Sequence, residues 1–192
     1  MKQKIQSSFK AKVKDAILNL KALNSFHFLE NLSQSFVCIL NSIKSGNKII
    51  FCGNGGSAAD SQHLAGELVA QFLDKKRNSI PAISLTTNTS TITAIANDIS
   101  FNRIFSRQIQ SLGKPKDILF CISTSGKSKN ILEALKAAKK NKMKTILLTG
   151  KNKIRNKYLD FQINVSGNRV DKIQEQHIMI GHFLCEFLEN NH

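Results

Sequence analysis

The sequence predicts an α/β protein with a doubly wound, five-stranded parallel sheet flanked by helices and preceded by long N-terminal helices. From residue 48 onward, short apolar runs alternate with amphipathic stretches. The runs show little polar alternation, as expected for strands that are covered on both faces. The 192 residues suit one domain, and 41% hydrophobic residues are enough for its core.

The N-terminal helices are predicted by apolar residues at helical spacing between residues 3 and 45, and the pattern ends at Gly46. Either one or two long helices fit this segment. The apolar stripe on residues 5–40 is more than a single sheet layer could readily bury. Residues 1–192 as a whole are expected to form a single domain.

Five apolar runs predict the strands, at residues 48–52, 82–85, 118–122, 145–149 and 161–165. The intervening helices are expected at residues 57–73, 89–96, 101–112, 128–141 and 171–190. Ligands of such sheets bind beyond the carboxyl ends of the strands, on the turns that open the following helices. The candidate turns are therefore those that follow the first three strands, at residues 53–57, 86–90 and 123–128.

The net charge of +15 comes from 28 Lys and Arg against 13 Asp and Glu. Residues 1–50 hold 8 basic and 2 acidic side chains, residues 113–157 hold 13 and 2, and the remainder holds 7 and 9. A basic surface can bind nucleic acid. However, 23 of the cations are Lys, spread along helical patterns with few aromatic residues beside them for base stacking. We therefore expect solvated helix faces and no nucleic-acid partner.

No segment approaches the roughly 18 apolar residues of a membrane span, and the N-terminal residues do not resemble a secretory signal. We therefore expect a cytoplasmic protein with no membrane partner. The four cysteines lie far apart in apolar surroundings, which predicts reduced core thiols rather than metal ligands or disulfides. They are Cys38, Cys52, Cys121 and Cys185.

The turn at residues 123–128 combines four hydroxyl side chains with a glycine, between a buried strand and the start of a helix. Backbone N–H groups at a helix N-terminus, joined by hydroxyl donors, can bind phosphate. The alternative is an ordinary serine-rich cap, but one cap needs only one hydroxyl. Four hydroxyls therefore favour an anion site. The spacing of a nucleotide-binding P-loop is missing.

The turn at residues 53–57 lacks the third glycine of a dinucleotide fingerprint. Its glycines would let a ligand approach the backbone closely, and Asn54 and Ser57 would add side-chain hydrogen bonds. A purely structural tight turn is the alternative.

Two pairs of polar residues share helix faces further along the chain. His63 and Glu67 are spaced i, i+4 and lie one turn apart. Gln174 and His182 are eight residues apart, hence about 80° around the helix and roughly 12 Å along it. Side chains lean toward the helix N-terminus, so His182 tilts back toward Gln174. A ligand or metal between the two helices would be able to contact all four side chains.

Together these motifs resemble the sugar isomerase (SIS) domain family and, within it, the phosphoheptose isomerases. The matching stretches are residues 53–67, 96–98, 122–128 and 172–182, and the resemblance runs from about residue 10 to the C-terminus. It implies a flavodoxin-like SIS fold and a homotetramer in which residues 1–45 form a helical oligomerisation segment whose helices pack together. The apolar stripe on residues 5–40 agrees with this expectation. It also implies isomerisation of sedoheptulose 7-phosphate to D-glycero-D-manno-heptose 7-phosphate through an enediol, for lipopolysaccharide or other surface glycans.

The resemblance also assigns residue roles by motif position. Glu67 and His182 would be the acid/base pair. The substrate phosphate would be bound by Ser123, Thr124, Ser125 and Ser128. The sugar would contact Asn54, Gly55, Gly56, Ser57, Glu67, Asn97, Asp98, Asp171 and Gln174. In zinc-containing members, one ion per subunit would be bound by His63, Glu67, Gln174 and His182.

Some positions depart from the family pattern. Gln71 stands where an arginine commonly follows the catalytic glutamate, and Lys172 stands where an arginine precedes Ile-Gln-Glu. Ile99 and Ser100 replace an aromatic residue and a glycine, and residues 151–156 replace a glycine-rich stretch. These changes would alter oligomer contacts or efficiency without removing the acid/base pair.

The main alternative is the noncatalytic SIS protein that binds the replication initiator. That branch tends to lack the catalytic glutamate and histidine, so the presence of Glu67 and His182 favours the enzyme. A phosphosugar-sensing or inactive SIS domain is a third reading.

Overall fold

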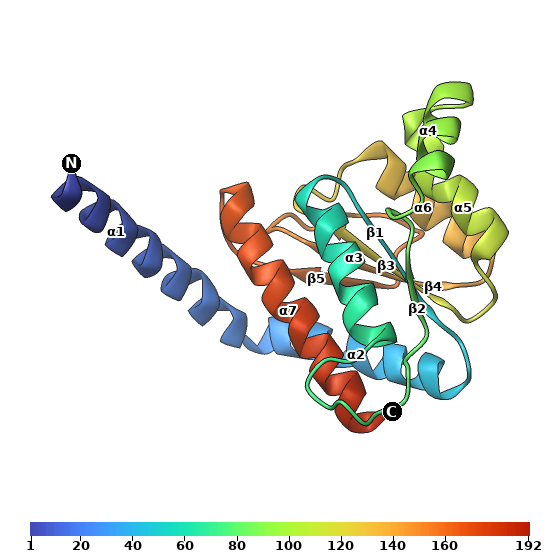
Figure 1. The fold of residues 1–192 in the computed structure, drawn as a ribbon, viewed down its shortest axis with the longest axis horizontal. Coiled ribbons are helices and arrows are strands. Elements are labelled where there is room, and N and C mark those ends of the chain that lie inside the picture. The colour runs from blue at the N-terminus through green and yellow to red at the C-terminus, as the bar shows by residue number, and fades with distance from the viewer.

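The computed structural model describes residues 1–192 and contains a five-stranded, all-parallel sheet with helices on both faces (Figure 1). The strand order is β2-β1-β3-β4-β5, so the winding direction changes between β1 and β3. The strands are β1 (Ile49–Gly53), β2 (Ala82–Ser84), β3 (Ile118–Ser123), β4 (Lys144–Thr149) and β5 (Phe161–Asn164). The predicted doubly wound α/β fold is confirmed.

The helices agree with the predicted ranges within a few residues, apart from two segments. They are α1 (Lys2–Lys21), α2 (Phe26–Lys44), α3 (Gly56–Val69), α4 (Thr89–Asp98), α5 (Ile104–Leu112), α6 (Lys129–Lys140) and α7 (Val170–Asn191). Residues 70–73, predicted as helix, lie beyond the end of α3, and residues 101–103 form a 3-10 turn, η2 (Phe101–Arg103), before α5. None of the helices combines the length and the hydropathy needed to cross a membrane.

Two cores lie on opposite faces of the sheet. One lies under α2, α3 and α7, where the rings of Phe51 and Phe120 meet with centroids 5.5 Å apart. The other lies under α4, α5 and α6, where the sulfurs of Cys52 and Cys121 are 3.5 Å apart. Successive strand residues face opposite sides, and both sides are covered, which explains the continuous apolar runs in the sequence.

The N-terminal segment forms two helices, α1 and α2, separated by the 3-10 turn η1 (Ala22–Asn24). α2 packs on the sheet, whereas α1 extends away from the domain and has no buried residue (Figure 1). Its apolar stripe is exposed, and Phe9 retains 65% of its surface. A stripe of this kind on a projecting helix is typical of an element that packs against another chain.

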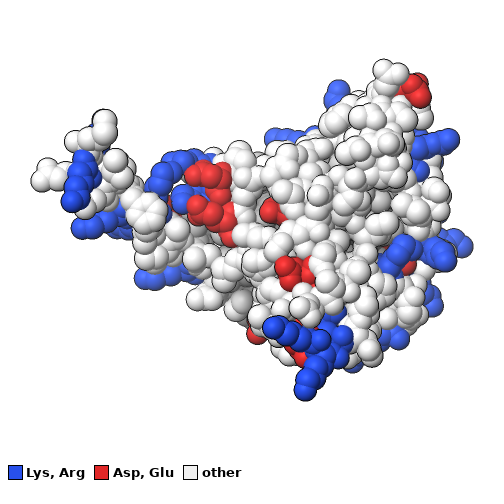
Figure 2. Space-filling model, in the orientation of Figure 1, with Lys and Arg blue, Asp and Glu red and all other residues white.

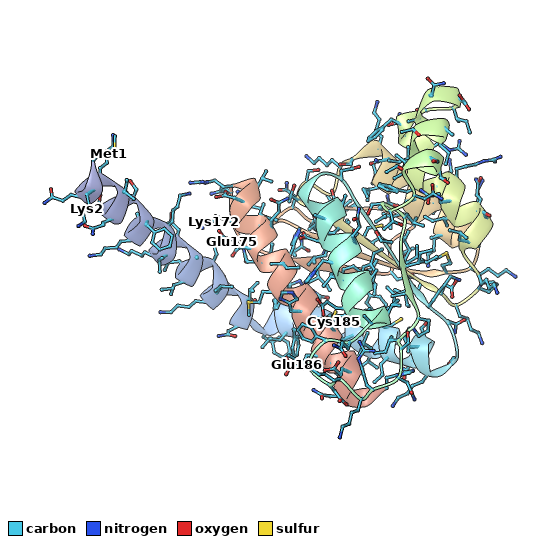
Figure 3. The ribbon with its side chains drawn as sticks, viewed as in Figure 1. Met1, Lys2, Lys172, Glu175, Cys185 and Glu186 are labelled. Carbon is cyan, nitrogen blue, oxygen red and sulfur yellow. The ribbon has the colours of Figure 1, made fainter.

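On the face shown in Figure 2, most basic side chains lie near the edge of the molecule. Figure 2 shows Lys and Arg along α1 and around the lower and right edges, whereas the central face over α3 and α7 is mainly uncharged with acidic patches. Acidic side chains of this face include Glu175 and Glu186 on α7 (Figure 3). The charge distribution agrees with the segment counts, in which most of the predicted sugar site lies outside the basic segments and only the turn at residues 123–128 lies within one of them.

Candidate active site

The turns after β1 and β3 lie side by side at the carboxyl ends of the strands. Gly53 is in register with Ile122, and the side-chain amides of Asn54 and Asn130 exchange two hydrogen bonds of 2.9 and 2.8 Å. Gly55 precedes α3 with φ of +57°, a conformation that favours glycine. The amide of Asn54 thus ties the two turns together and keeps one N–H for a ligand.

The turn at residues 123–128 uses only part of its hydroxyl set for its own structure. Ser123 Oγ accepts the N–H of Gly126, and Ser125 Oγ accepts the N–H of Lys127, each at 3.2 Å. Ser128 is the N-cap residue of α6, but its side chain forms no capping hydrogen bond. The ordinary-cap alternative therefore does not describe this turn. The Ser128 hydroxyl lies at the N-terminus of α6, where phosphate is favoured.

α3 and α7 approach closely because glycines stand at their contacts. A Cβ added at Gly181 of α7 would lie 2.6 Å from Cδ1 of the fully buried Leu64 of α3. A Cβ added at Gly56 of α3 would lie 2.1 Å from Nε2 of Gln174 of α7. The absence of side chains at both positions lets the two helices bring their polar residues together.

The imidazoles of His63 and His182 meet between the two helices. Their Nε2 atoms are 2.8 Å apart, and the rings are edge to face at 73°. The Glu67 carboxylate lies 3.7 Å from Nδ1 of His63. The side chains of His63 and Glu67 are 43% and 25% exposed, so a ligand has access to them. The structure thus brings together three of the predicted side chains from both helices.

Asp60 is a further polar group at this place, and sequence reasoning missed it. Its Oδ2 atom is buried without a hydrogen-bond partner. Burial raises the pKa of the Asp60 carboxyl above its ordinary value, and the nearby His63 and His182 partly offset this rise. The available signal was spacing, because Asp60, His63 and Glu67 follow the i, i+3, i+7 pattern of one helix face.

Three predicted sugar-binding residues lie apart from this cluster within the subunit. Asn97 and Asp98 end α4, which packs against α5 and η2, and their side chains are exposed and joined by a 2.8 Å hydrogen bond. Asp171, in the first turn of α7, pairs with Arg169 at 2.8 Å. The roles of these residues in sugar binding therefore stay predictions.

Zinc fits the donor chemistry of the site in part. Two imidazoles, a carboxylate and an amide are oxygen and nitrogen donors that zinc accepts. No group of three His, Cys, Asp or Glu side chains is arranged to hold a metal ion. Two of the predicted ligand atoms, Nε2 of His63 and Nε2 of His182, do lie next to each other. Glu67 faces the other nitrogen of His63, so its side chain has to rotate to complete the predicted ligand set.

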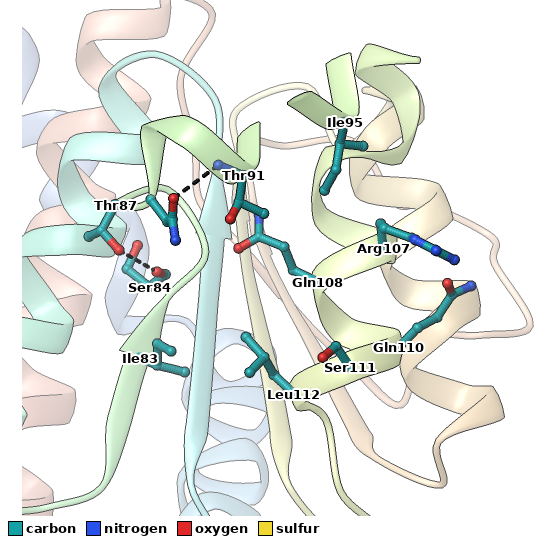
Figure 4. Close-up of a pocket in the computed structure, with 11 residues that line it drawn as sticks. Ile83, Ser84, Thr87, Thr91, Ile95, Arg107, Gln108, Gln110, Ser111 and Leu112 are labelled. Carbon is teal, nitrogen blue, oxygen red and sulfur yellow. Dashed lines mark hydrogen bonds between the residues drawn. The ribbon is translucent and has the colours of Figure 1, made fainter. Parts of the chain in front are cut away.

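A further cavity lies outside this cluster. It has a volume of about 830 Å³ and lies between β2, α4 and α5 (Figure 4). Amide and hydroxyl side chains line it together with Arg107, and two of the lining residues, Thr87 and Asn88, belong to the candidate turn at residues 86–90. None of the residues assigned to the phosphate, the sugar or zinc lines it. Because it contains no acid/base pair, its chemistry does not suit an isomerase, and we place the candidate active site between α3 and α7.

Comparison with known proteins supports the motif assignment. A family model described as the SIS domain matches residues 9–150. The phosphoheptose isomerase of Clostridium acetobutylicum is 44% identical over 187 residues, which cover 96% of this chain and 91% of that protein. The phosphoheptose isomerase of a Nitratiruptor species is 49% identical over 158 residues, which cover 82% and 83%.

Two solved structures are similar over nearly their whole lengths. The phosphoheptose isomerase of Neisseria gonorrhoeae superposes with a TM-score of 0.88 at 36% identity, covering 97% of this chain and 99% of that one. That of Francisella tularensis superposes with a TM-score of 0.85 at 34% identity, covering 98% and 97%. The resemblance inferred from the motifs is confirmed: the chain belongs to the SIS domain family and, within it, to the phosphoheptose isomerases.

Proposed function

We propose that the chain interconverts sedoheptulose 7-phosphate and D-glycero-D-manno-heptose 7-phosphate, and so supplies heptose for lipopolysaccharide or other surface glycans. The observation that carries this function is the meeting of His63, Glu67 and His182 between α3 and α7. α3 begins beside the predicted phosphate turn. His63 follows Gly56 by seven residues, about 10 Å along the axis, a span that suits an extended seven-carbon sugar phosphate.

The reaction moves a carbonyl from C2 to C1 without net gain or loss of atoms. The Glu67 carboxylate removes a proton from C1 of the open-chain ketose, and O2 gains a proton, which gives the 1,2-enediol. The proton on Glu67 then returns at C2 while O1 loses its proton, and the aldose forms. The imidazole of His182 moves the oxygen protons, because its two nitrogens provide one donor and one acceptor. His182 also assists ring opening.

Zinc is part of the proposal, at one ion per subunit. His63, Glu67, Gln174 and His182 would hold it, and it would polarise the carbonyl and enediolate oxygens. Glu67 cannot use one lone pair for zinc and for a proton, so its ligation must be monodentate or transient. Metal analysis after dialysis against zinc should give one ion per subunit, and markedly less in His63→Ala. Wild-type protein that retains no zinc would contradict this part.

We also propose that the chain forms a homotetramer. We expect this assembly to lie in the cytoplasm. The support is the exposed stripe of α1 and a groove of about 400 Å³ between α2 and α7, lined mainly by apolar side chains such as Phe36 and Phe187. Light scattering should give four times the 21.4 kDa chain mass, and Phe9→Glu should lower it. A monomer mass for the wild type would refute the assembly.

The catalytic assignment is tested by Glu67→Gln and His182→Ala. Each should lower kcat by about 10²- to 10⁴-fold with little change in thermal stability, because both side chains are partly exposed. Glu186→Gln provides a matched control, since Glu186 is an exposed carboxylate that lies one turn after His182 in α7. Near-normal turnover in either site variant would remove that residue from the mechanism. The initiator-binding alternative is not favoured, because Glu67 and His182 are both present and the matched relatives carry the isomerase name.

A further inference from the structure

The segment that follows α3 is tied to the end of α7 by an ion pair. Arg77 Nε lies 2.7 Å from Oε2 of Glu189, and the two side chains are only 7% and 3% exposed. Burial alone would raise the pKa of Glu189. Hydrogen bonds from Arg77 and from three backbone N–H groups outweigh this and hold the pKa below its ordinary value. Glu189 is therefore a fully engaged carboxylate.

Both partners of the ion pair also bind backbone groups close to the active site. Glu189 accepts hydrogen bonds from the N–H groups of Phe72, Leu73 and Asp74 at 3.2, 2.9 and 2.8 Å. Arg77 donates from Nη1 to the carbonyl of Leu68 at 2.9 Å, and from Nη2 to the carbonyl of Glu67. These carbonyls belong to the last turn of α3, whose orphan acceptors Arg77 satisfies. The same contacts explain why the helix ends at Val69 and does not reach residue 73.

The segment held in this way delivers an aromatic ring to the catalytic histidine. The Phe72 ring stacks on the imidazole of His182, with centroids 5.6 Å apart and planes inclined by 24°. The imidazole of His63 also contacts His182, and these two rings meet edge to face. His182 is thus in contact with two rings, Phe72, whose backbone N–H is bound by Glu189, and the imidazole of His63.

Cys185 lies at the centre of the same region (Figure 3). Burial, with the nearby Glu67 and Glu189 carboxylates, raises the pKa of its thiol to about 12, and Arg77 opposes the rise. The ion pair and the proposed catalytic carboxylate therefore both lie near this thiol, between α3 and α7.

We propose that Arg77, Glu189 and Phe72 form a clamp that positions the acid/base groups for catalysis. The ion pair fixes the backbone at Glu67, and through the Phe72 N–H it fixes the ring that orients His182. None of the three touches the reacting atoms, so they are positioning residues. The inference rests on the proposed isomerase function, and it adds residues that the motif comparison does not assign.

A purely structural role is the competing explanation, because buried ion pairs whose partners are removed singly destabilise proteins whether or not a site lies nearby. Phe72 separates the two explanations, since its ring is outside the ion pair. Phe72→Leu keeps the N–H that Glu189 accepts and removes the stacking. Phe72→Tyr keeps the ring. Asp160→Asn is the matched control for Glu189→Gln, because Asp160 also accepts from a cation, Lys139, and from a backbone N–H, away from the site.

The experiment combines steady-state kinetics, thermal unfolding and imidazole NMR on the full chain. Phe72→Leu should lower kcat about tenfold and leave KM within about twofold, as misplacement of a catalytic group does, while Phe72→Tyr restores kcat. The His182 ring-proton resonances, identified by their loss in His182→Ala, should shift in Phe72→Leu because the ring current is removed. They should not shift in Asp160→Asn.

Glu189→Gln should lower kcat at temperatures where the protein is folded, whereas Asp160→Asn should lose thermal stability only. If Phe72→Leu keeps the wild-type kcat and its His182 resonances do not shift, the clamp is refuted. This test does not depend on whether Glu189→Gln folds. An inactive wild-type protein would refute the proposed isomerase function instead, and the NMR comparison would then decide the clamp by itself.

Discussion

Gly56→Ala is expected to lower activity without lowering stability. Gly56 is the first residue of α3, and a Cβ at this position would lie 2.1 Å from Nε2 of Gln174 and 3.0 Å from its Cδ. The atom in the way is the end of a flexible side chain and not backbone. The helix can therefore accept alanine if the Gln174 amide leaves its position.

The size of the effect follows from this contact. Ordinary van der Waals contact begins at 3.4 Å, so Nε2 must retreat by about 1.3 Å from its 2.1 Å separation. Misplacement of a site group by about 1 Å costs roughly 10²-fold in rate, or about 2.7 kcal/mol of transition-state stabilisation. The free energy of unfolding should rise, because alanine is favoured over glycine in a helix by up to about 1 kcal/mol.

The assay is kcat/KM for sedoheptulose 7-phosphate together with urea unfolding. Gly66→Ala is the matched control, since Gly66 lies in the same helix and a Cβ there meets nothing within 4 Å. Both variants should be as stable as the wild type or slightly more so, and only Gly56→Ala should lose activity. If Gly56→Ala retains full activity, the Gln174 amide has no part in the site. If it unfolds, the contact is structural.

Three further results are expected. Burial lowers the pKa of His177 to about 4, so below about pH 6.5 the unfolded chain takes up a proton that the folded protein does not. The free energy of unfolding should therefore be highest above pH 6.5 and fall by up to about 3 kcal/mol toward pH 4. Urea unfolding at pH 7 and pH 5 measures this difference, which should be absent in His177→Gln. Ser128→Ala should raise KM by about tenfold or less without lowering stability, because its hydroxyl caps no helix, and an unchanged KM would exclude it from phosphate binding. Gly181→Ala should cost about 1–3 kcal/mol of stability through overpacking on Leu64, and a variant as stable as the wild type by urea unfolding would show that α3 and α7 separate easily.

The sequence predicted the strands well because the apolar runs of β1 and β3 are buried on both faces and have no helical period that competes with this interpretation. The edge strands β2 and β5 are only partly buried, but their runs are also short and bounded by turn residues. The pairing of His63 with Glu67 was equally predictable, since helix geometry alone sets it. The meeting of His63 with His182, 119 positions apart, depends on the packing of two helices. Helix geometry suggested only that a ligand between these helices could contact both residues, and the motif resemblance gave them a shared site.

Contacts between distant segments account for what the sequence did not predict. The end of α3 at Val69 depends on Arg77 and on Glu189, 112 residues further along, so local propensity predicted a longer helix. The spacing of Asp60 places it on the same face of α3 as His63 and Glu67, but the burial of its carboxylate without a hydrogen-bond partner depends on tertiary packing. The placement of Asn97 and Asp98 away from α7 likewise follows from the packing of α4 against α5.

The central claim is that this chain is an isomerase acting through the groups between α3 and α7. The most direct measurement incubates the purified full-length protein with sedoheptulose 7-phosphate, with added zinc in one arm and a chelator in the other, and detects the aldose 7-phosphate by NMR. The account predicts that D-glycero-D-manno-heptose 7-phosphate forms in at least one arm and that Glu67→Gln abolishes it. The absence of aldose product in both arms would contradict the account.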